Sequence, residues 1–394
     1  MLIGVPRETY PGERRVALVP NVLASLAKAG LDVVIEAGAG AQAGYPDGEY
    51  AAKGGKITGD RAELFGSADI IVQVLCHGSN DRTGAADLPL LRTGQILMGF
   101  LRPLGTLETI EQVASTGVTS FSIELMPRST RAQSMDALSS MGTICGYKAV
   151  LIAADTVPKI FPMLTTAAGT ITPARVLIIG AGVAGLQAIA TARRLGAVVS
   201  AYDVRPAAKE QVQSLGGRFV ELPIEATDAE DKAGYARPQD EAFYKRQREL
   251  LGKVVAESDV VITAAVIPGR TSPILVTREM VAAMAPGSVI VDLAAERGGN
   301  CEVTRAGETF TEGGVTIIGR FNLASSVPYH ASQMYGRNLA AFLLYLVRDG
   351  KLQLDPKDEI VSSTLLTRGG EVVNARVREF FSLPPLAAHQ EATG

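Results

Sequence analysis

The residues most able to do chemistry lie directly after a short apolar run, Val176 to Ile179, which is typical of a buried parallel strand. Three glycines follow it with the spacing G-x-G-x-x-G. In that spacing the first glycine permits a sharp turn, the second lets the backbone approach a pyrophosphate, and the third lets the next helix pack against the strand. The free N–H groups at the start of that helix suit a diphosphate. The pattern predicts a dinucleotide site at Gly180, Ala181, Gly182, Val183 and Gly185.

An acidic residue follows the next apolar run at the spacing that a ribose site requires. Ala197–Tyr202 is predicted to be a strand, and Asp203 comes directly after it, where a carboxylate can accept from both ribose hydroxyls. A carboxylate repels a 2′-phosphate, so Asp203 favours NAD(H) over NADP(H), although the nearby Arg205 weakens that preference. The alternative is a strand-to-helix turn that binds nothing. Strand, glycines, helix, second strand and acid together favour the dinucleotide site.

The elements that must position these residues are strands alternating with helices, which indicates parallel sheets covered on both faces. Around the glycines we predict six strands: Val176–Gly180, Val198–Asp203, Arg218–Glu221, Val260–Ala264, Val289–Asp292 and Thr316–Ile318. An earlier set has no G-x-G-x-x-G: Leu2–Val5, Val33–Ile35, Ile70–Leu75, Ile96–Phe100 and Val118–Ser122.

The chain of 394 residues is too long for one ordinary core. We therefore predict an α/β fold with two doubly wound, Rossmann-like domains. The first comprises residues 1–143 and 325–394 and is discontinuous, and the second, residues 144–324, binds NAD. The last segment is expected to contain a helix from Ser332 to Arg348 and a weak strand pair near Ile360–Ser363 and Gly369–Val373.

Composition excludes several classes of protein. A net charge of −3 gives no basic field for nucleic acid. Cys76, Cys145 and Cys301 are too widely spaced for a disulfide framework or a zinc site, and no histidine, cysteine and aspartate cluster has metal-ligand spacing. The N-terminus reaches Pro6 too early for a signal peptide, and no apolar run approaches the roughly 18 residues of a membrane span.

A polar stretch from residue 124 to residue 140 interrupts the alternation where one domain should pass into the next. The amide of Gln133 and the hydroxyl of Ser139 suit a carboxamide or a ribose, and Arg128 and Asp136 can pair across the loop and fix its shape. In the alternative interpretation, Asp136 and Ser134 only cap the following helix while the arginines face solvent.

The three histidines offer little acid–base chemistry. His77 follows a strand, His330 precedes a helix and His389 lies in the tail, and a lone histidine is more often structural, although His77 or His330 remains a candidate acid. The sequence therefore predicts a nucleotide site without an obvious acid–base catalyst. Hydride transfer between two nicotinamides fits this, because it requires no proton transfer to a substrate.

Over almost its whole length the sequence closely resembles the soluble NAD(H)-binding alpha subunits of proton-translocating nicotinamide nucleotide transhydrogenases. The most specific motif is Met126-Pro-Arg with Arg131-Ala-Gln-Ser-Met-Asp. The others are Pro6-Arg-Glu with Arg15-Val-Ala, Gly180 to Gln187, Gly234-Tyr-Ala, Ile267-Pro-Gly, Gly287-Ser-Val-Ile-Val-Asp-Leu-Ala and Gly298-Gly-Asn-Cys.

The resemblance implies roles for individual residues. Arg128, Asp136 and Ser139 would hold the nicotinamide and its carboxamide, while Gln133 would reach towards the second nucleotide. The further contacts it implies are Ser129, Thr130, Arg131, Ser134 and Met135 in the loop, Asp203, Val204 and Arg205 at the adenosine ribose, Gln247 and Val266 in the cleft, and Gly234 and Tyr235 in a lobe that closes over the nucleotide.

The resemblance also implies the partners. NAD(H) would bind to this chain and NADP(H) to a beta subunit, a separate membrane subunit would translocate protons, and the chain would form a homodimer. Some family members fuse membrane helices to the C-terminus, whereas this chain stops at Gly394. We therefore expect a cytoplasmic protein, attached to the cytoplasmic face of the inner membrane through its partners without direct insertion.

Two other functions are weighed against this one. The same fold resembles alanine dehydrogenase, which keeps a lysine for the substrate carboxylate and a histidine as acid–base. The comparable strand ends here carry Gln73 and Arg102, which counts against amino-acid chemistry because imine and carbonyl substrates need a proton relay. The other is a non-catalytic NAD sensor, but a sensor needs no residue such as Gln133 directed at a second nucleotide.

Overall fold

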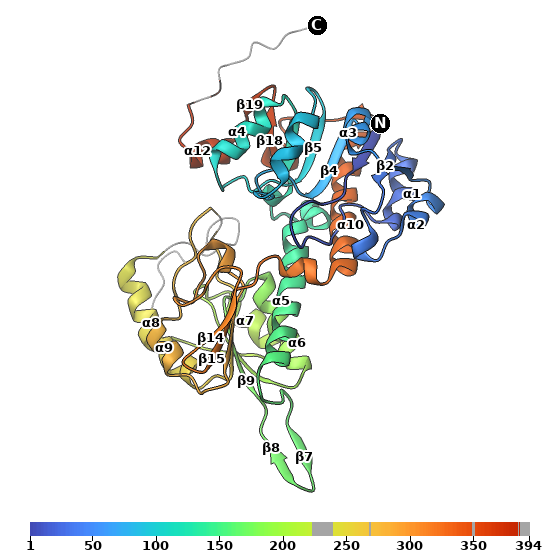
Figure 1. The fold of residues 1–394 in the computed structure, drawn as a ribbon. Helices are drawn as coiled ribbons and strands as arrows, with labels where there is room; N and C mark the ends of the chain where they lie inside the picture. The colour runs from blue at the N-terminus through green and yellow to red at the C-terminus, as the bar shows by residue number, and fades with distance from the viewer. Residues whose placement is uncertain (223–238, 268, 349–350, 385, 387–394) are drawn as a thin grey trace. The chain divides into compact units, whose positions relative to one another are not determined.

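The computed structural model describes residues 1–222, 239–267, 269–348, 351–384 and 386. The chain divides into two units, Met1–Met141 with Val327–Gly394, and Gly142–Ser326 (Figure 1). The first boundary falls within helix α5 (Ala137–Thr156). Each unit contains one large open sheet flanked by helices, so the predicted α/β, Rossmann-like fold class is confirmed.

The sheet of unit 2 has the strand order β11-β10-β9-β12-β13-β15-β14, and only β14 and β15 pair antiparallel. The order reverses between β9 and β12, and in such sheets the ligand binds beyond the carboxyl ends of the strands at that point. The strands are β9 (Arg175–Ile179), β10 (Val198–Tyr202), β11 (Arg218–Phe219), β12 (Val260–Thr263), β13 (Val289–Asp292), β14 (Thr309–Glu312) and β15 (Val315–Ile318). All six predicted strands are present, and β14 is an edge strand that the sequence interpretation missed.

Alternate residues of these strands face two different cores. In β9, Val176 and Ile178 pack beneath α5, α6 and α7, whereas Leu177 and Ile179 pack beneath α8 and α9 on the other face (Figure 1). Both faces are therefore dry, which explains the continuous apolar runs. The helices are α6 (Val183–Arg194), α7 (Ala208–Ser214), α8 (Glu241–Ala256) and α9 (Arg278–Ala282), and an exposed hairpin is formed by β7 (Leu164–Thr166) and β8 (Gly169–Ile171).

The sheet of unit 1 has the order β19-β18-β6-β5-β4-β1-β2-β3, so its six parallel strands follow the same order as a dinucleotide fold. The last segment of the chain extends this sheet, because β18 pairs antiparallel with β6 and Ser120 Oγ lies 2.7 Å from Thr367 Oγ1. The strands are β1 (Leu2–Val5), β2 (Asp32–Glu36), β3 (Lys56–Thr58), β4 (Ile70–Leu75), β5 (Ile96–Phe100), β6 (Thr119–Ser122), β18 (Leu365–Arg368) and β19 (Glu371–Val372).

One helix of the returning segment fills a face of this sheet. The ring of Phe342 on α10 meets Phe121 of β6 edge-on at 5.7 Å, and Tyr335 donates to the Gln73 carbonyl of β4 at 2.7 Å. The helices of unit 1 are α1 (Pro20–Lys28), α2 (Asp47–Ala52), α3 (Arg61–Ser67), α4 (Leu107–Ser115), α10 (Pro328–Leu346), α11 (Glu359–Thr364) and α12 (Ala375–Phe380). β16 (Val347–Arg348) pairs antiparallel with β17 (Lys351–Leu352).

Two expectations need correction. Ile360–Ser363 was predicted as a strand from its β-branched residues but lies in α11, because Asp358 caps that helix by accepting from the N–H groups of Ile360 and Val361. The strand pair is β18 with β19. The 20-residue helix α5 is also long and apolar enough to cross a membrane by length and composition alone, a test that core helices of soluble proteins pass as well.

Candidate functional site

The turn between β9 and α6 has the backbone geometry that its glycines predict. Gly180 adopts φ +98°, a left-handed conformation that disfavours any side chain. A Cβ on Gly185 would lie 1.8 Å from the carbonyl oxygen of Gly180, so the first turn of α6 packs directly on the end of β9. The helix N-terminus is thereby held at the switch point of the sheet.

Gly182 leaves open space at the N-terminus of α6. It is the N-cap residue, no side chain among the described residues caps the helix, and a Cβ added there would meet nothing within 4 Å. The free N–H groups of the first turn and the helix dipole therefore face an open cradle, which is the environment that a diphosphate requires. Val183 begins the helix behind this cradle.

Asp203 lies at the end of β10 and is only 8% exposed. Its Oδ2 accepts from the backbone N–H of Ala181 at 2.7 Å, which ties the glycine turn to the neighbouring strand. Arg205 donates from its backbone N–H and its Nε to Oδ1, at 2.8 and 2.9 Å, and from Nη2 to Oδ2 at 3.0 Å. The acid is thus fixed beside the turn by a guanidinium from its own loop.

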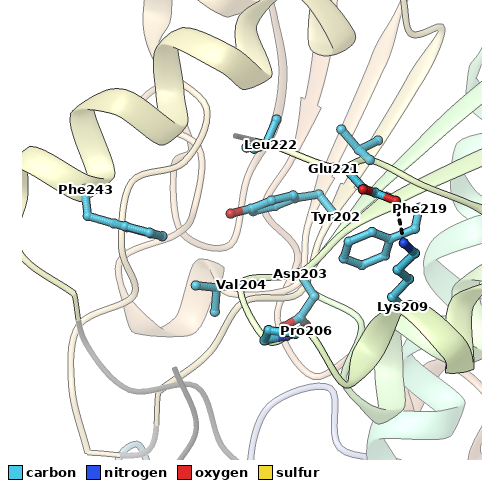
Figure 2. A pocket seen from close by; sticks show the side chains of 10 residues that line it. Tyr202, Asp203, Val204, Pro206, Lys209, Phe219, Glu221, Leu222 and Phe243 are labelled. Atoms are coloured by element: carbon cyan, nitrogen blue, oxygen red, sulfur yellow. Dashed lines mark ion pairs between the residues drawn. The ribbon is translucent and has the colours of Figure 1, made fainter. Parts of the chain in front are cut away.

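A pocket of about 210 Å³ opens beyond the ends of β10 and β11 (Figure 2). Aromatic and aliphatic side chains form most of its wall, Asp203 lies at its edge, and Lys209 pairs with Glu221 at 2.6 Å. Apolar walls with a few polar groups suit a flat heterocycle joined to a ribose. The lining residues are Tyr202, Asp203, Val204, Pro206, Lys209, Phe219, Val220, Glu221, Leu222 and Phe243.

Gln247 supports this pocket from α8. Its side chain is 3% exposed and donates from Nε2 to the Tyr202 hydroxyl at 2.8 Å. Burial raises the pKa of Tyr202 to about 12, although the bond from Gln247 opposes that rise. Gln247 Oε1 is buried without a hydrogen-bond partner among the described residues.

A buried network at the next strand ends was not anticipated from the sequence. Asp292, the last residue of β13, accepts from the hydroxyls of Thr263 and Thr304 at 2.8 and 2.7 Å and from three backbone N–H groups. Asn300 bonds the carbonyls of Ala265 and Pro273. The network fixes the loop after β12, where the predicted contact Val266 lies partly exposed. The sequence signal for this network was Asp292 at the end of a predicted strand, followed by the turn Gly298-Gly-Asn300.

The polar loop of unit 1 has its own internal order. Asp136 precedes α5 and accepts from the backbone N–H and the hydroxyl of Ser139, at 2.9 and 2.5 Å. This is the capping interaction expected if the acid served only the helix, and it also fixes the Ser139 oxygen. Ser129 Oγ is buried without a partner among the described residues. Arg128 is exposed.

The middle of the loop is the 3₁₀ helix η4 (Thr130–Met135), which is anchored by two buried residues. Ala132 and Met135 are 0% and 4% exposed, whereas Gln133 is exposed, as is Arg131. Thr130 and Ser134 are exposed as well. The side chain of Met135 is therefore buried and anchors the loop. Arg131 pairs with Asp358 at 3.2 Å, so its charge is directed towards the protein.

The predicted contacts Gly234 and Tyr235 lie outside the described residues. Two positions of unit 1 were expected at strand ends. Gln73 lies inside β4, is buried and donates to Asp87 at 2.9 Å, while Arg102 follows β5 and is exposed. His77 Nε2 lies 2.6 Å from Gln112 Oε1. The two positions that would distinguish an amino-acid dehydrogenase thus hold a structural amide and a solvent-facing cation.

Known proteins resemble this chain over almost its whole length. Models of the alanine dehydrogenase/PNT N-terminal and C-terminal domains match residues 4–145 and 149–375. An NAD(P) transhydrogenase alpha subunit chain of Rhodospirillum rubrum is 44% identical over 377 residues, which cover 95% of this chain and 98% of that protein. The transhydrogenase structure from Sinorhizobium meliloti is 43% identical, covers 95% of this chain and 100% of its own, and has a TM-score of 0.82. An L-alanine dehydrogenase structure is 26% identical, covers 97% and 99%, and has a TM-score of 0.80.

Proposed function

Because the chain belongs to the alanine dehydrogenase/PNT family, we propose that it is the NAD(H)-binding component of an NAD(P) transhydrogenase. In this role it passes a hydride from NADH to NADP⁺ bound on a partner subunit, and membrane subunits couple the transfer to proton translocation. The relatives that are more than 40% identical are transhydrogenase subunits, whereas the alanine dehydrogenase structure is 26% identical.

Unit 2 supplies the residues for the adenosine and diphosphate end. The open cradle at Gly182 receives the diphosphate on the N–H groups of α6. Asp203 accepts from the ribose hydroxyls, and the pocket beside Tyr202 takes the adenine, with Gln247 behind it. The open space at Gly182 fits the diphosphate of a dinucleotide.

The loop of unit 1 supplies the residues for the nicotinamide end. The nicotinamide itself provides the hydride chemistry when it is bound. Asp136 fixes the Ser139 hydroxyl by accepting a hydrogen bond from it at 2.5 Å, and we assign this hydroxyl to the carboxamide. Arg128 and the buried hydroxyl of Ser129 complete the polar lining that we assign to this end.

The observation that carries the proposal is the exposed amide of Gln133 between two buried anchors, Ala132 and Met135. A rigid, outward-facing amide suits contact with a second nucleotide on another subunit, where the reacting carbons must approach to roughly 3–3.5 Å. Chemistry between two nicotinamides also needs no acid–base residue in place of Gln73 and Arg102.

The test is NADH oxidation by the purified chain under two conditions. One contains the NADP(H)-binding component of a transhydrogenase loaded with NADP⁺, and the other contains pyruvate and ammonium. We expect turnover only in the first. Turnover with pyruvate and ammonium would instead identify an alanine dehydrogenase with a displaced acid–base pair. We also propose a homodimer that is attached to the membrane through its partner subunits, and sedimentation of the purified chain can check its oligomeric state.

A further inference from the structure

The loop that carries Gln133 is held by the C-terminal segment of unit 1, which is far away in sequence. Helix η4 packs on α10, and the two are joined by a hydrogen bond from Asn338 Nδ2 to the Ser134 carbonyl oxygen at 2.8 Å. The bonded carbonyl belongs to the residue directly after Gln133. The position of the amide therefore depends on a residue of α10.

Asn338 is an unusual choice for a purely structural position. It is 8% exposed, and its Oδ1 is buried without a partner among the described residues. A buried oxygen without a partner lowers the stability of the folded chain, and an apolar side chain of similar size would avoid that cost. Within the described parts of the chain, the bond from Nδ2 to the loop is the one interaction that uses the polarity of this side chain.

A second attachment involves Arg131, near the start of η4, where Asp358 joins three elements. Its Oδ1 caps α11 by accepting from Ile360 and Val361 at 2.8 and 3.2 Å. Its Oδ2 accepts from the Tyr345 hydroxyl of α10 at 2.5 Å and faces Arg131 Nη2 of η4 at 3.2 Å. The guanidinium of Arg131 also lies 5.8 Å from the centre of the Tyr345 ring.

The two attachments act on the same short helix from both sides of Gln133. Arg131 is two residues before it and Ser134 one residue after it, while Ala132 and Met135 anchor the apolar side. Three-residue-per-turn helices of this length are weak by themselves, so external contacts decide the conformation of η4. Asn338 and Tyr345 are seven residues apart on α10 and therefore lie on one face of it.

We propose that Asn338 and Asp358 are positioning residues for hydride transfer, which hold η4 so that the amide of Gln133 is presented in one fixed orientation. This inference rests on the proposed function, because it assigns the purpose of the rigidity to Gln133. We place neither residue in contact with a nucleotide. Their loss misplaces a group that must be accurate to a fraction of an ångström.

Two variants separate positioning from folding. Asn338→Leu removes the bond to the loop and also the orphan oxygen, so its melting temperature should stay equal or rise. Asp358→Asn removes the charge that faces Arg131 but keeps the cap of α11, because asparagine caps helices as well as aspartate does. Asp355→Asn is the matched control, since Asp355 lies on the same segment and its carboxylate accepts from the nearby Lys357 N–H at 2.9 Å.

Amide hydrogen exchange of residues 130–136 is the direct readout. We expect both variants to raise the exchange rate of these amides about tenfold, while Asp355→Asn does not. NADH affinity should be unchanged, and hydride transfer to the NADP(H)-loaded component should slow by about 10- to 100-fold, since a misplacement of roughly 1 Å has an effect of that order.

The outcomes distinguish this inference from the proposed function. Unchanged exchange in the loop overturns the positioning role whatever the activity. Faster exchange with an unchanged rate of transfer shows that the rigidity does not serve the reaction, and it also overturns the inference. If the unaltered chain transfers no hydride to the partner component, the proposed function fails, and faster exchange without any such reaction overturns the assigned purpose as well.

Discussion

Arg205 donates hydrogen bonds to both carboxylate oxygens of Asp203, from Nε to Oδ1 at 2.9 Å and from Nη2 to Oδ2 at 3.0 Å. Arg205, whose charge would attract a 2′-phosphate, is therefore paired with Asp203, whose charge repels one. The two residues act as a single neutralised unit at the edge of the pocket. A ribose that bonds to Asp203 must compete with the guanidinium, so the pair sets both affinity and nucleotide choice.

Asp203→Asn should weaken the preference of the site for NADH over NADPH. The amide oxygen can still accept from Ala181 N–H and preserve the glycine turn, but the negative charge is lost and Arg205 becomes available. We expect the Kd for NADH to rise about tenfold, or about 1.4 kcal/mol, while NADPH binds more tightly than to the unaltered chain. Nucleotide fluorescence reports both, because the chain contains no tryptophan.

The matched control is Asp259→Asn, at the opposite end of the same sheet, where Asp259 accepts from the Arg175 N–H at 2.9 Å. It should alter neither Kd. If Asp203→Asn leaves the Kd for NADH and the Kd for NADPH at their values in the unaltered chain, Asp203 does not contact the ribose.

Two glycine substitutions should separate folding from binding. In Gly185→Ala the new methyl would lie 1.8 Å from the Gly180 carbonyl oxygen, so α6 must move and unit 2 should lose about 1–3 kcal/mol of stability. In Gly182→Ala the methyl meets nothing within 4 Å, so the melting temperature should be retained, yet NADH binding should be lost because the methyl occupies the diphosphate cradle. Calorimetry measures the stability of both variants, and titration with NADH measures their affinity. Tight NADH binding by Gly182→Ala would argue against a diphosphate at that turn.

Gln133→Asn should slow hydride transfer by about 10- to 100-fold without weakening NADH binding. The shorter side chain keeps the amide but withdraws it towards η4, and its exposed position means that stability is unaffected. Stopped-flow transfer to the NADP(H)-loaded component measures the rate, and a fluorescence titration measures the affinity. Equal losses in both quantities would place Gln133 in the NADH site itself.

The stability of unit 1 should depend on pH through Glu8. Burial raises the pKa of this carboxyl from 4.5 to about 8, with the charge of Glu13 adding to the rise, although Val74 and Leu75 N–H groups donate to it at 2.6 and 3.1 Å. Because the folded-state pKa lies above the unfolded value, the folded chain binds the proton more tightly. This contribution to stability is full below about pH 4.5 and is lost as the pH rises towards 8.

Glu8→Gln should remove that dependence. The amide remains uncharged at every pH and its oxygen can still accept from Val74 or Leu75. We expect the melting temperature of the unaltered chain to fall relative to the variant between pH 5 and pH 8, with the two converging at the acid end. Parallel melting curves across this range would show that Glu8 does not titrate with a raised pKa.

The sequence alone determined the features that are encoded by neighbouring residues. Apolar runs, the glycine spacing and the acid after β10 depend on contacts within a few residues, so the two Rossmann-like units and the turn at Gly180 could be predicted. The role of the loop at Gln133 was inferred from the family resemblance. The strand predicted at Ile360 was wrong because one capping side chain, Asp358, outweighed the β-branched composition.

Only the tertiary structure decided how these groups are partnered. It directs Arg131 to Asp358, places Asn338 beneath Ser134, and buries Gln247 against Tyr202, and none of these pairs is close in sequence. Arg205 is close to Asp203, yet its bidentate pairing depends on a side-chain conformation that local pattern does not encode. Periodicity records which face of an element is buried. The partner of a polar group is set instead by distances between elements, and these exist only once the chain has packed.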